Sequence, residues 1–293
     1  MNVRIMVGAT AIMSSLVGCG GGGSSFSSAQ AQFATSASPT IDTAPIGTRF
    51  GLSQRSARLR NGTFSIDGGD GSPVNIEVLS PTRLQVESRE FGTAELVNRG
   101  SSMGISAYAT DNSSEPFVVG LSVIDDYSIA GIAALASDEL SDDGVATVFH
   151  TGFQTPASAV PTSSSSVVFY DGQFLGLRAD VSAAELFEIS GLVEMDVDFN
   201  TSSMTGAVFA GTETSTTRAD FNTILLSGNI VGSAVNGTAE IGLGFGNPSD
   251  FTVGRTGPLE MQFYGPSANE LAGVLEIVDS NGDVLLGSMS GAP

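Results

Sequence analysis

Lysine and tryptophan are absent from this 293-residue sequence, and cysteine and histidine occur once each. A single Cys excludes an intramolecular disulfide bond. A hydrolytic triad or a zinc site needs several imidazole or thiolate groups, so this scarcity excludes the usual forms of both. The sequence therefore predicts a protein that is not an enzyme and that has no metal site and no cofactor.

The one histidine, His150, leaves a single cofactor open. A His beside Phe149 is typical of a surface or interface position, and the alternative is axial ligation of haem iron. The acid pairs Asp125–Asp126 and Asp142–Asp143 supply carboxylates, but adjacent acids point to opposite faces of a strand and are solvated in a loop. We therefore expect no glycosidase chemistry.

Positive charge is also scarce. Eleven basic residues, all Arg, stand against 31 acidic ones, which gives a formal net charge of −20. The excess lies after Gly100, where three Arg accompany 24 acids. Such a field repels nucleic acid and anionic membranes, so no nucleic-acid partner is expected. A generally acidic secreted proteome would give the same imbalance without any partner.

The chain starts with a segment typical of an exported lipoprotein. Met1–Arg4 is a short basic stretch, Ile5–Leu16 is an apolar run too short to span a bilayer, and Leu-Val-Gly-Cys ends at Cys19. LVGC resembles the bacterial lipobox, which implies a signal peptide over residues 1–18 and lipidation of Cys19. Gly20, where an Asp would retain the protein at the inner membrane in enteric bacteria, favours the outer membrane and the cell surface. The Gly/Ser/Ala-rich residues 19–44 are predicted to be a flexible tether.

Composition and patterning then predict an all-β protein. Glycine is abundant, with 37 residues, and charged residues make up only 14%, which favours short strands and tight turns over charged helices. Residues 45–154 are predicted to be a small N-terminal β-rich domain. In Gly191–Asn200, Val193, Met195, Val197 and Phe199 alternate with Glu194, Asp196 and Asp198. That period predicts a strand with an apolar inner face and a wet outer face.

The end of the chain predicts a strand, a turn and a hairpin. Leu259, Met261 and Phe263 alternate with Glu260, Gln262 and Tyr264, so the second set is expected to face water. Asn281–Gly282 predicts a type I′ hairpin turn. With turns this closely spaced over residues 155–293, an up-and-down antiparallel barrel of about eight strands is the simplest way to remove exposed edges.

Four segments also resemble one family. They are TPASAVPTSSSSVVFYDG (155–172), LVEMDVDFNTSSMTG (192–206), ADFNTILLSGNIVG (219–232) and FYGPSANELAGVLEI (263–277). Their order and spacing resemble the β-barrel of transferrin-binding protein B-like surface lipoproteins. The resemblance covers close to half of the chain and implies an outer-membrane, surface-anchored module that binds a protein or an iron-bearing ligand.

Two other functions stay open at this point. One is a structural or export-coupled coat lipoprotein without a small-molecule ligand, and the other is an integral outer-membrane barrel. For the binding module, the partners expected are the membrane through its lipid anchor and a protein with a basic surface or an outer-membrane receptor. The loops that are candidates for ligand binding contain Asp125, Asp126, Asp142, Asp143, Asp250 and Arg255.

Overall fold

The computed structural model describes residues 40–293 apart from short gaps. The gaps are 42, 45–46, 52, 61–62, 68–73, 81, 89–91, 103–104, 111–116, 137–143, 163–166, 181–184, 215–216, 221 and 245–250. Cys19, Asp142, Asp143 and Asp250 therefore lie outside the described residues. Within the described part, no helix is long and apolar enough to cross a membrane.

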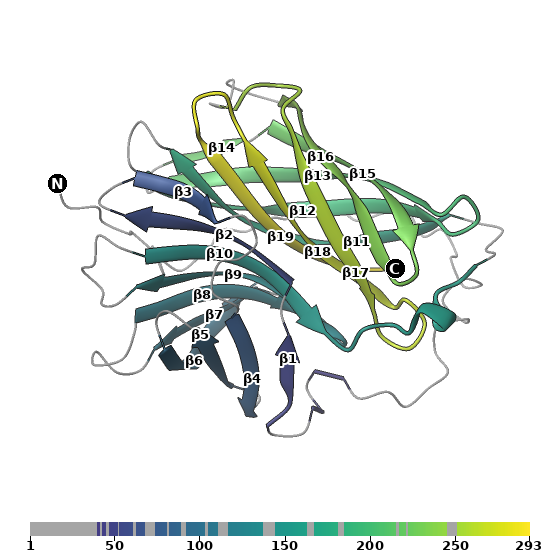
Figure 1. Cartoon of the computed structure of the whole chain (residues 1–293), viewed down its shortest axis with the longest axis horizontal. Helices are drawn as coiled ribbons and strands as arrows, with labels where there is room; N and C mark the ends of the chain where they lie inside the picture. The colour runs from purple at the N-terminus through teal and green to yellow at the C-terminus, as the bar shows by residue number, and fades with distance from the viewer. Residues whose placement is uncertain are drawn as a thin grey trace.

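The C-terminal half is a closed antiparallel barrel (Figure 1). Its strands are β11 (Val168–Asp180), β12 (Glu185–Asp198), β13 (Ser203–Thr214), β15 (Asn222–Val231), β16 (Ala234–Gly244), β17 (Thr256–Tyr264), β18 (Glu270–Val278) and β19 (Val284–Ala292). Each pairs with the next, and β19 pairs with β11 to close the ring. The short β14 (Thr217–Asp220) adds to β13. The predicted eight-stranded up-and-down barrel is confirmed.

The inside of the barrel is an apolar core. Large side chains with 0–2% exposure fill it, among them Tyr170, Phe174, Met195, Phe199, Met204 and Phe263. On β12 the predicted register is confirmed, since Val193, Met195 and Val197 are buried inside while Glu194 and Asp196 face water. A membrane-spanning barrel has the reverse arrangement, with its apolar face outward. The inner face of these strands is therefore the hydrophobic core of the domain.

The last hairpin forms as predicted, but its turn type differs. β18 and β19 pair from Val278 and Val284 inward, and Gly282 has a φ of 87°. A type I′ turn would also need a positive φ at Asn281, and among the described non-glycine residues only Ser202 and Ala268 have one. Asp279 N donates to Asp283 O at 2.9 Å, so the loop is a longer one that uses only glycine's left-handed conformation.

The N-terminal half is one ten-stranded antiparallel sheet, called here the N-terminal sheet. It consists of β1 (Arg49–Gly51), β2 (Ser53–Arg60), β3 (Thr63–Asp67), β4 (Val74–Ser80), β5 (Arg83–Ser88), β6 (Gly92–Ser102), β7 (Ile105–Thr110), β8 (Phe117–Ile124), β9 (Ser128–Ala136) and β10 (Gly144–Gly152). β4 to β10 form a meander, β2 and β3 add beside β10, and β1 adds beside β4.

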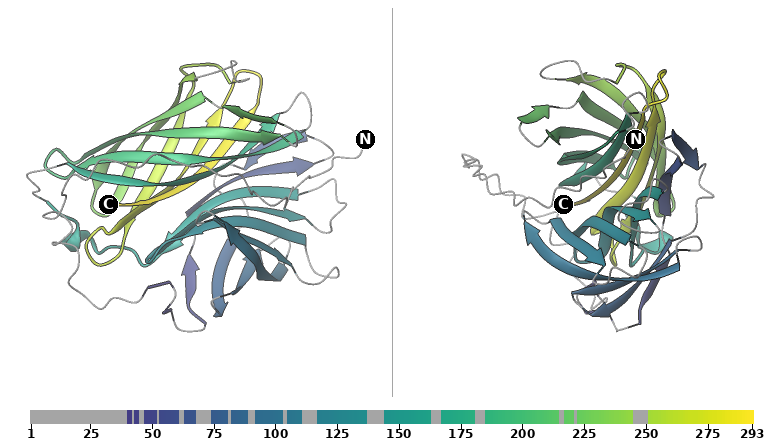
Figure 2. Two further views of the ribbon diagram at one scale, coloured as in Figure 1. Left: turned by 180° about the vertical axis from the view of Figure 1, so that it is seen from behind. Right: turned by 90° about the vertical axis from the view of Figure 1, so that its left-hand side faces the viewer.

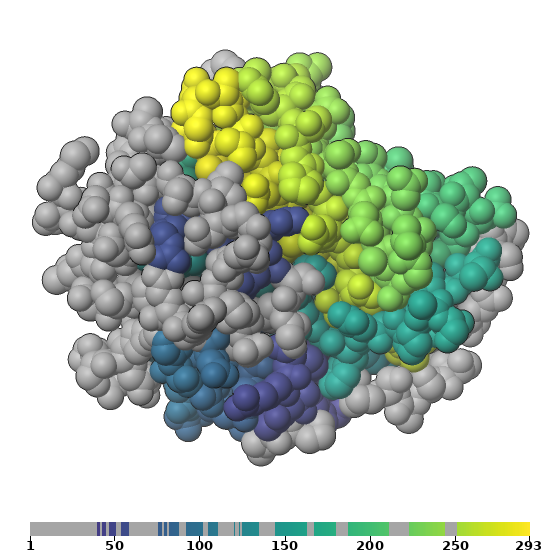
Figure 3. Space-filling model, viewed as in Figure 1, coloured from purple at the N-terminus to yellow at the C-terminus, as the bar shows by residue number. Residues whose placement is uncertain are grey.

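The N-terminal sheet has its own core and also packs on the barrel. One face encloses Phe50, Ile76, Leu96 and Tyr108. The other face, over β2, β9 and β10, lies against β11, β18 and β19, as Figures 1 and 2 show from opposite sides. In the space-filling view of Figure 3, the purple of the N-terminal strands meets the yellow of the last barrel strands directly.

This contact divides the outside of the barrel into two parts. We call the outer face of β18, of β19, of residues 175–179 of β11 and of Tyr264 at the end of β17 the covered wall, because the N-terminal sheet lies on it. The outer face of β12, β13, β15, β16 and residues 168–173 of β11 is the free wall. A 3-10 helix, η2 (Ala157–Ala159), lies in the connection from β10 to β11.

Candidate functional site

The covered wall carries a polar seam at the end where β18 begins. Glu270 accepts hydrogen bonds from the Tyr127 amide at 3.0 and 3.1 Å and from Ser128 Oγ at 2.7 Å. Ser290 Oγ donates to the Asp125 carboxylate beside it. These bonds cross from the N-terminal sheet to the barrel, so they fix how the two parts sit together.

Burial changes the acidity of both carboxyls in this seam. Loss of water raises the pKa of Glu270 to about 7, although the Ser128 hydrogen bond opposes the rise. Burial also raises the pKa of Asp125, against the lowering effect of its bond from Ser290. Near neutral pH, Glu270 is therefore shared between its protonated and ionised forms.

His150 also lies in this contact. Its Nδ1 is 2.7 Å from the hydroxyl oxygen of Tyr264, the two rings meet edge-on at 82°, and the imidazole is only 2% exposed. Burial lowers the pKa of His150 to about 3, so the ring is neutral at ordinary pH. Haem would reach this imidazole only after the N-terminal sheet separates from the barrel.

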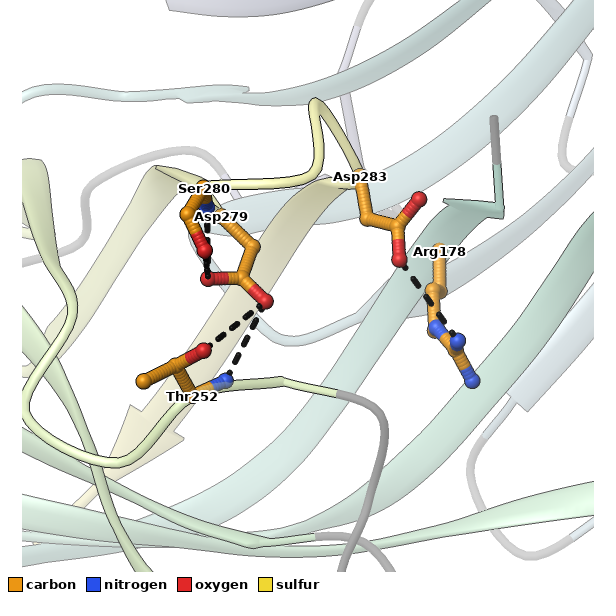
Figure 4. Close-up of polar contacts among 5 residues, drawn as sticks. All are labelled: Arg178, Thr252, Asp279, Ser280 and Asp283. Atoms are coloured by element: carbon orange, nitrogen blue, oxygen red, sulfur yellow. Dashed lines mark hydrogen bonds and ion pairs between the residues drawn. The ribbon is translucent and has the colours of Figure 1, made fainter. Parts of the chain in front are cut away.

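A second polar cluster closes the opposite end of the barrel (Figure 4). Asp279 accepts hydrogen bonds from Thr252 N and Oγ1, both at 3.2 Å, and from Ser280 N at 2.6 Å. Arg255 Nε lies 3.3 Å from the same carboxylate. Burial raises the pKa of Asp279, but the hydrogen bonds from Ser280 and Thr252 outweigh it and hold the pKa below its usual value. The cluster fastens the loop after β16 to the last hairpin.

Arg178 lies inside the barrel at this same end. Its guanidinium is 5.5 Å from the Phe187 ring centre and 5.7 Å from that of Phe251, and its Nη2 is 3.9 Å from Asp283 Oδ2. Sequence reasoning missed this residue. The available signal was a lone arginine at an inward position of an apolar strand, LGLRAD.

The three candidate loop residues that the structure describes do not gather into one site. Asp125 is half-buried in the polar seam and Asp126 is exposed next to it. Arg255 lies at the other end of the barrel, on Asp279. Among the described residues, no group of three or more His, Cys, Asp or Glu is placed to hold a metal ion. A role of these loops in binding stays a prediction.

The free wall is the part of the barrel's outer surface that the described strands of the N-terminal sheet do not cover. Leu192, Phe209 and Leu225 are exposed on it by 56%, 45% and 46%. They lie on three consecutive barrel strands, and Leu192 is the direct cross-strand partner of Phe209. Carboxylates stand on both sides of them. This wall combines exposed apolar and acidic side chains on rigid strands.

The architecture is that of an all-β scaffold protein, in which a sheet domain packs on one wall of an eight-stranded barrel filled with side chains. Residues 152–292 match the family described as the C-lobe and N-lobe beta barrels of Tf-binding protein B. The match confirms, for this part of the chain, the resemblance seen in the sequence.

Two solved structures similar to this chain are mutants of the vaccine antigen transferrin-binding protein B from Haemophilus parasuis Hp5. The double mutant is 15% identical and the single mutant 16%, each over 83% of this chain, with a TM-score of 0.53. This chain spans 44% and 45% of their lengths, less than half in both cases. A search among curated proteins finds no significant match. At this identity the structural likeness concerns the fold.

Proposed function

We propose that this protein is a surface-anchored lipoprotein whose barrel and N-terminal sheet form a binding module for a protein ligand. The observation that carries the proposal is the filled barrel of the transferrin-binding protein B family. Because packed side chains occupy the inside, recognition has to use the outer walls and loops, which suits a macromolecule better than a small molecule. Catalysis forms no part of the proposal.

The ligand class in this proposal is an iron-carrying protein, and the two similar structures carry transferrin in their names. The test uses residues 20–293, immobilised, against a panel of iron-carrying host proteins of different net charge, transferrin included. A haem titration followed by absorbance runs beside it. We expect at least one protein to bind with an association rate that falls as salt rises, since the module is strongly acidic.

The two arms of this test separate the two kinds of ligand. Haem held in an apolar pocket would bind with little salt dependence and would give a new absorbance band. If no protein of the panel binds and haem gives no band, the binding proposal fails, and a coat lipoprotein without a ligand replaces it.

The membrane attachment is proposed at Cys19, at the outer membrane and on the cell surface. One acyl chain holds a protein on a membrane only marginally, whereas several chains on one Cys are sufficient. Cys19→Ala should move the protein from the detergent-extracted membrane fraction to the soluble fraction. Added protease should remove the wild-type protein from intact cells. Membrane retention of the variant at unchanged gel mobility would rule out this anchor.

A further inference from the structure

The free wall carries a continuous apolar stripe. Leu192 pairs directly with Phe209, and Ala207 pairs directly with Leu225. Phe209 is two residues from Ala207 on β13, so it lies diagonally across from Leu225, within reach of an aromatic ring. The stripe, defined as Leu192, Ala207, Phe209 and Leu225, thus crosses three adjacent strands.

Carboxylates border this stripe on both sides. Glu240 is the cross-strand partner of Leu225, and Glu194 is the partner of Ala207. On the far side of Glu194, Asp171 lies directly opposite it, so two like charges face each other across β11 and β12. Such a pair is unfavourable in the isolated protein. A cation placed between them would remove the repulsion.

None of the described arginines of the barrel forms an ion pair with these carboxylates. Arg178 points inward, Arg255 is held by Asp279, and the side chain of Arg218 is not among those described. In the N-terminal sheet, Arg49, Arg55 and Arg83 each form an ion pair with a Glu other than these. The free wall is therefore apolar at its centre and negative at its border.

We propose that the free wall is the docking face of this module and that its occupant is a protein surface with apolar side chains bordered by Lys or Arg. The inference deepens the proposed function and rests on it in naming a protein as ligand. Apolar burial would supply the affinity, and the bordering charges would select the partner and speed its encounter. A second copy of this chain would bring acid against acid, and an anionic membrane would be repelled.

The test starts from three variants of residues 20–293. The stripe variant is Leu192→Ser with Phe209→Ser and Leu225→Ser, and the border variant is Glu194→Gln with Glu240→Gln. The matched control is Val253→Ser with Glu87→Gln, an apolar and an acidic exposed residue outside the free wall. All the changed side chains are exposed on the surface, so each variant should melt close to wild type.

The probe does not require the natural ligand. It is a twelve-residue synthetic peptide of alternating Leu and Lys, beside one of alternating Leu and Glu. We expect the Lys peptide to bind wild type and the control within twofold of each other and the stripe variant about tenfold or more weakly, because centrally placed aromatic and apolar anchors carry most interface energy. The border variant should slow association and flatten its salt dependence. The Glu peptide should not bind.

A photo-crosslinking amino acid at position 209 gives the location directly. In this otherwise wild-type protein, the Lys peptide should crosslink at position 209, and a fivefold excess of unlabelled peptide should compete. Equal binding of the Lys peptide by the stripe variant and by wild type overturns the docking face. Two other results would overturn the proposed occupant. One is that the wild-type protein forms a dimer and the stripe variant does not, and the other is that the protein binds vesicles rich in anionic lipid. Because these measurements use a synthetic probe, they stay readable whether or not any iron-carrying protein binds.

Discussion

The free wall and the covered wall belong to the same barrel and obey the same alternation, yet their outward residues meet different surroundings. On β12 the outward Leu192, Glu194 and Asp196 face water. On β19 the outward Leu286 and Ser288 are each 1% exposed, because the N-terminal sheet lies on them. Inward residues are buried on both walls. One period-2 pattern thus serves two environments, and the chemistry of the outward residues tells them apart.

The largest effect should come from the inner face, where the walls do not differ. Val197→Asp places a carboxylate among apolar side chains without a partner and should cost at least about 3 kcal/mol of unfolding free energy. Asp196→Asn, one residue away on the outer face, should stay within about 0.5 kcal/mol. Urea denaturation of both variants measures this. Similar losses in the two would show that the assigned faces are wrong.

A leucine pair separates the two walls from each other. Leu286→Ala on the covered wall should cost about 2–4 kcal/mol, since it leaves a cavity between barrel and sheet. Leu192→Ala on the free wall should change stability by about 0.5 kcal/mol or less. Both leucines point outward from the barrel, so the difference between their melting-temperature shifts reports whether the N-terminal sheet covers the side chain. Equal shifts would mean that the sheet does not seal its wall.

The covered wall should also respond to pH through Glu270. Its pKa in the folded protein is about 7, above the 4.5 of an exposed Glu. Protonation is thus favoured by folding, so its contribution is complete below about pH 4.5 and is lost as pH rises to about 7. The loss amounts to about 3 to 4 kcal/mol at most, at roughly 1.4 kcal/mol per pH unit.

The Glu270→Gln variant tests this assignment. The variant should match wild type near pH 4.5 and exceed it near pH 8, with a flatter profile between. Asp125, whose pKa is raised by the same burial, leaves a smaller slope of the same sign. A wild-type stability that rises with pH over this window, or an unchanged slope in the variant, would contradict it.

The smallest effects belong to one turn on each wall. Gly282, at a φ of 87°, closes the hairpin of the covered wall, and Ser202, at 53°, closes the β12–β13 hairpin of the free wall. Gly282→Ala should cost about 1 kcal/mol because an L side chain strains this conformation. Ser202→Gly should gain a few tenths of a kcal/mol. Chemical denaturation should show changes of opposite sign in the unfolding free energies of the two variants. Changes of the same sign would refute the argument from φ.

The barrel could be predicted because its signals are local. Alternation in Val193–Phe199 and turn residues near Asn281–Gly282 gave the strands, the register and the last hairpin, and the motifs gave the family. The turn type was wrong because the hairpin forms a longer loop in which Gly282 alone takes a positive φ. Neither strand identity nor face depended on that detail.

The covered wall could not be predicted, because its burial depends on a segment more than a hundred residues away in sequence. Tyr264 was expected to face water with Glu260 and Gln262, but it is 1% exposed against His150. The prediction was right for Glu260 and wrong for Tyr264, since the N-terminal sheet covers only one end of β17. Outward Ala272 and Val274, apolar where β12 has acids, were the available signal.

The seam between the first and last barrel strands also bears on how the chain folds. β11 pairs with β19 along nine residues, and these two strands with β18 form the seat of the N-terminal sheet. The barrel and the surface that carries the N-terminal sheet are therefore completed only when β19, the last barrel strand to be synthesised, pairs with β11. Among neighbouring barrel strands, this pair is separated by the longest stretch of chain. Until β19 arrives, the apolar interior and two strand edges stay open to other chains. Such an intermediate is prone to aggregate, so a chaperone that shields it would increase the yield of folded protein.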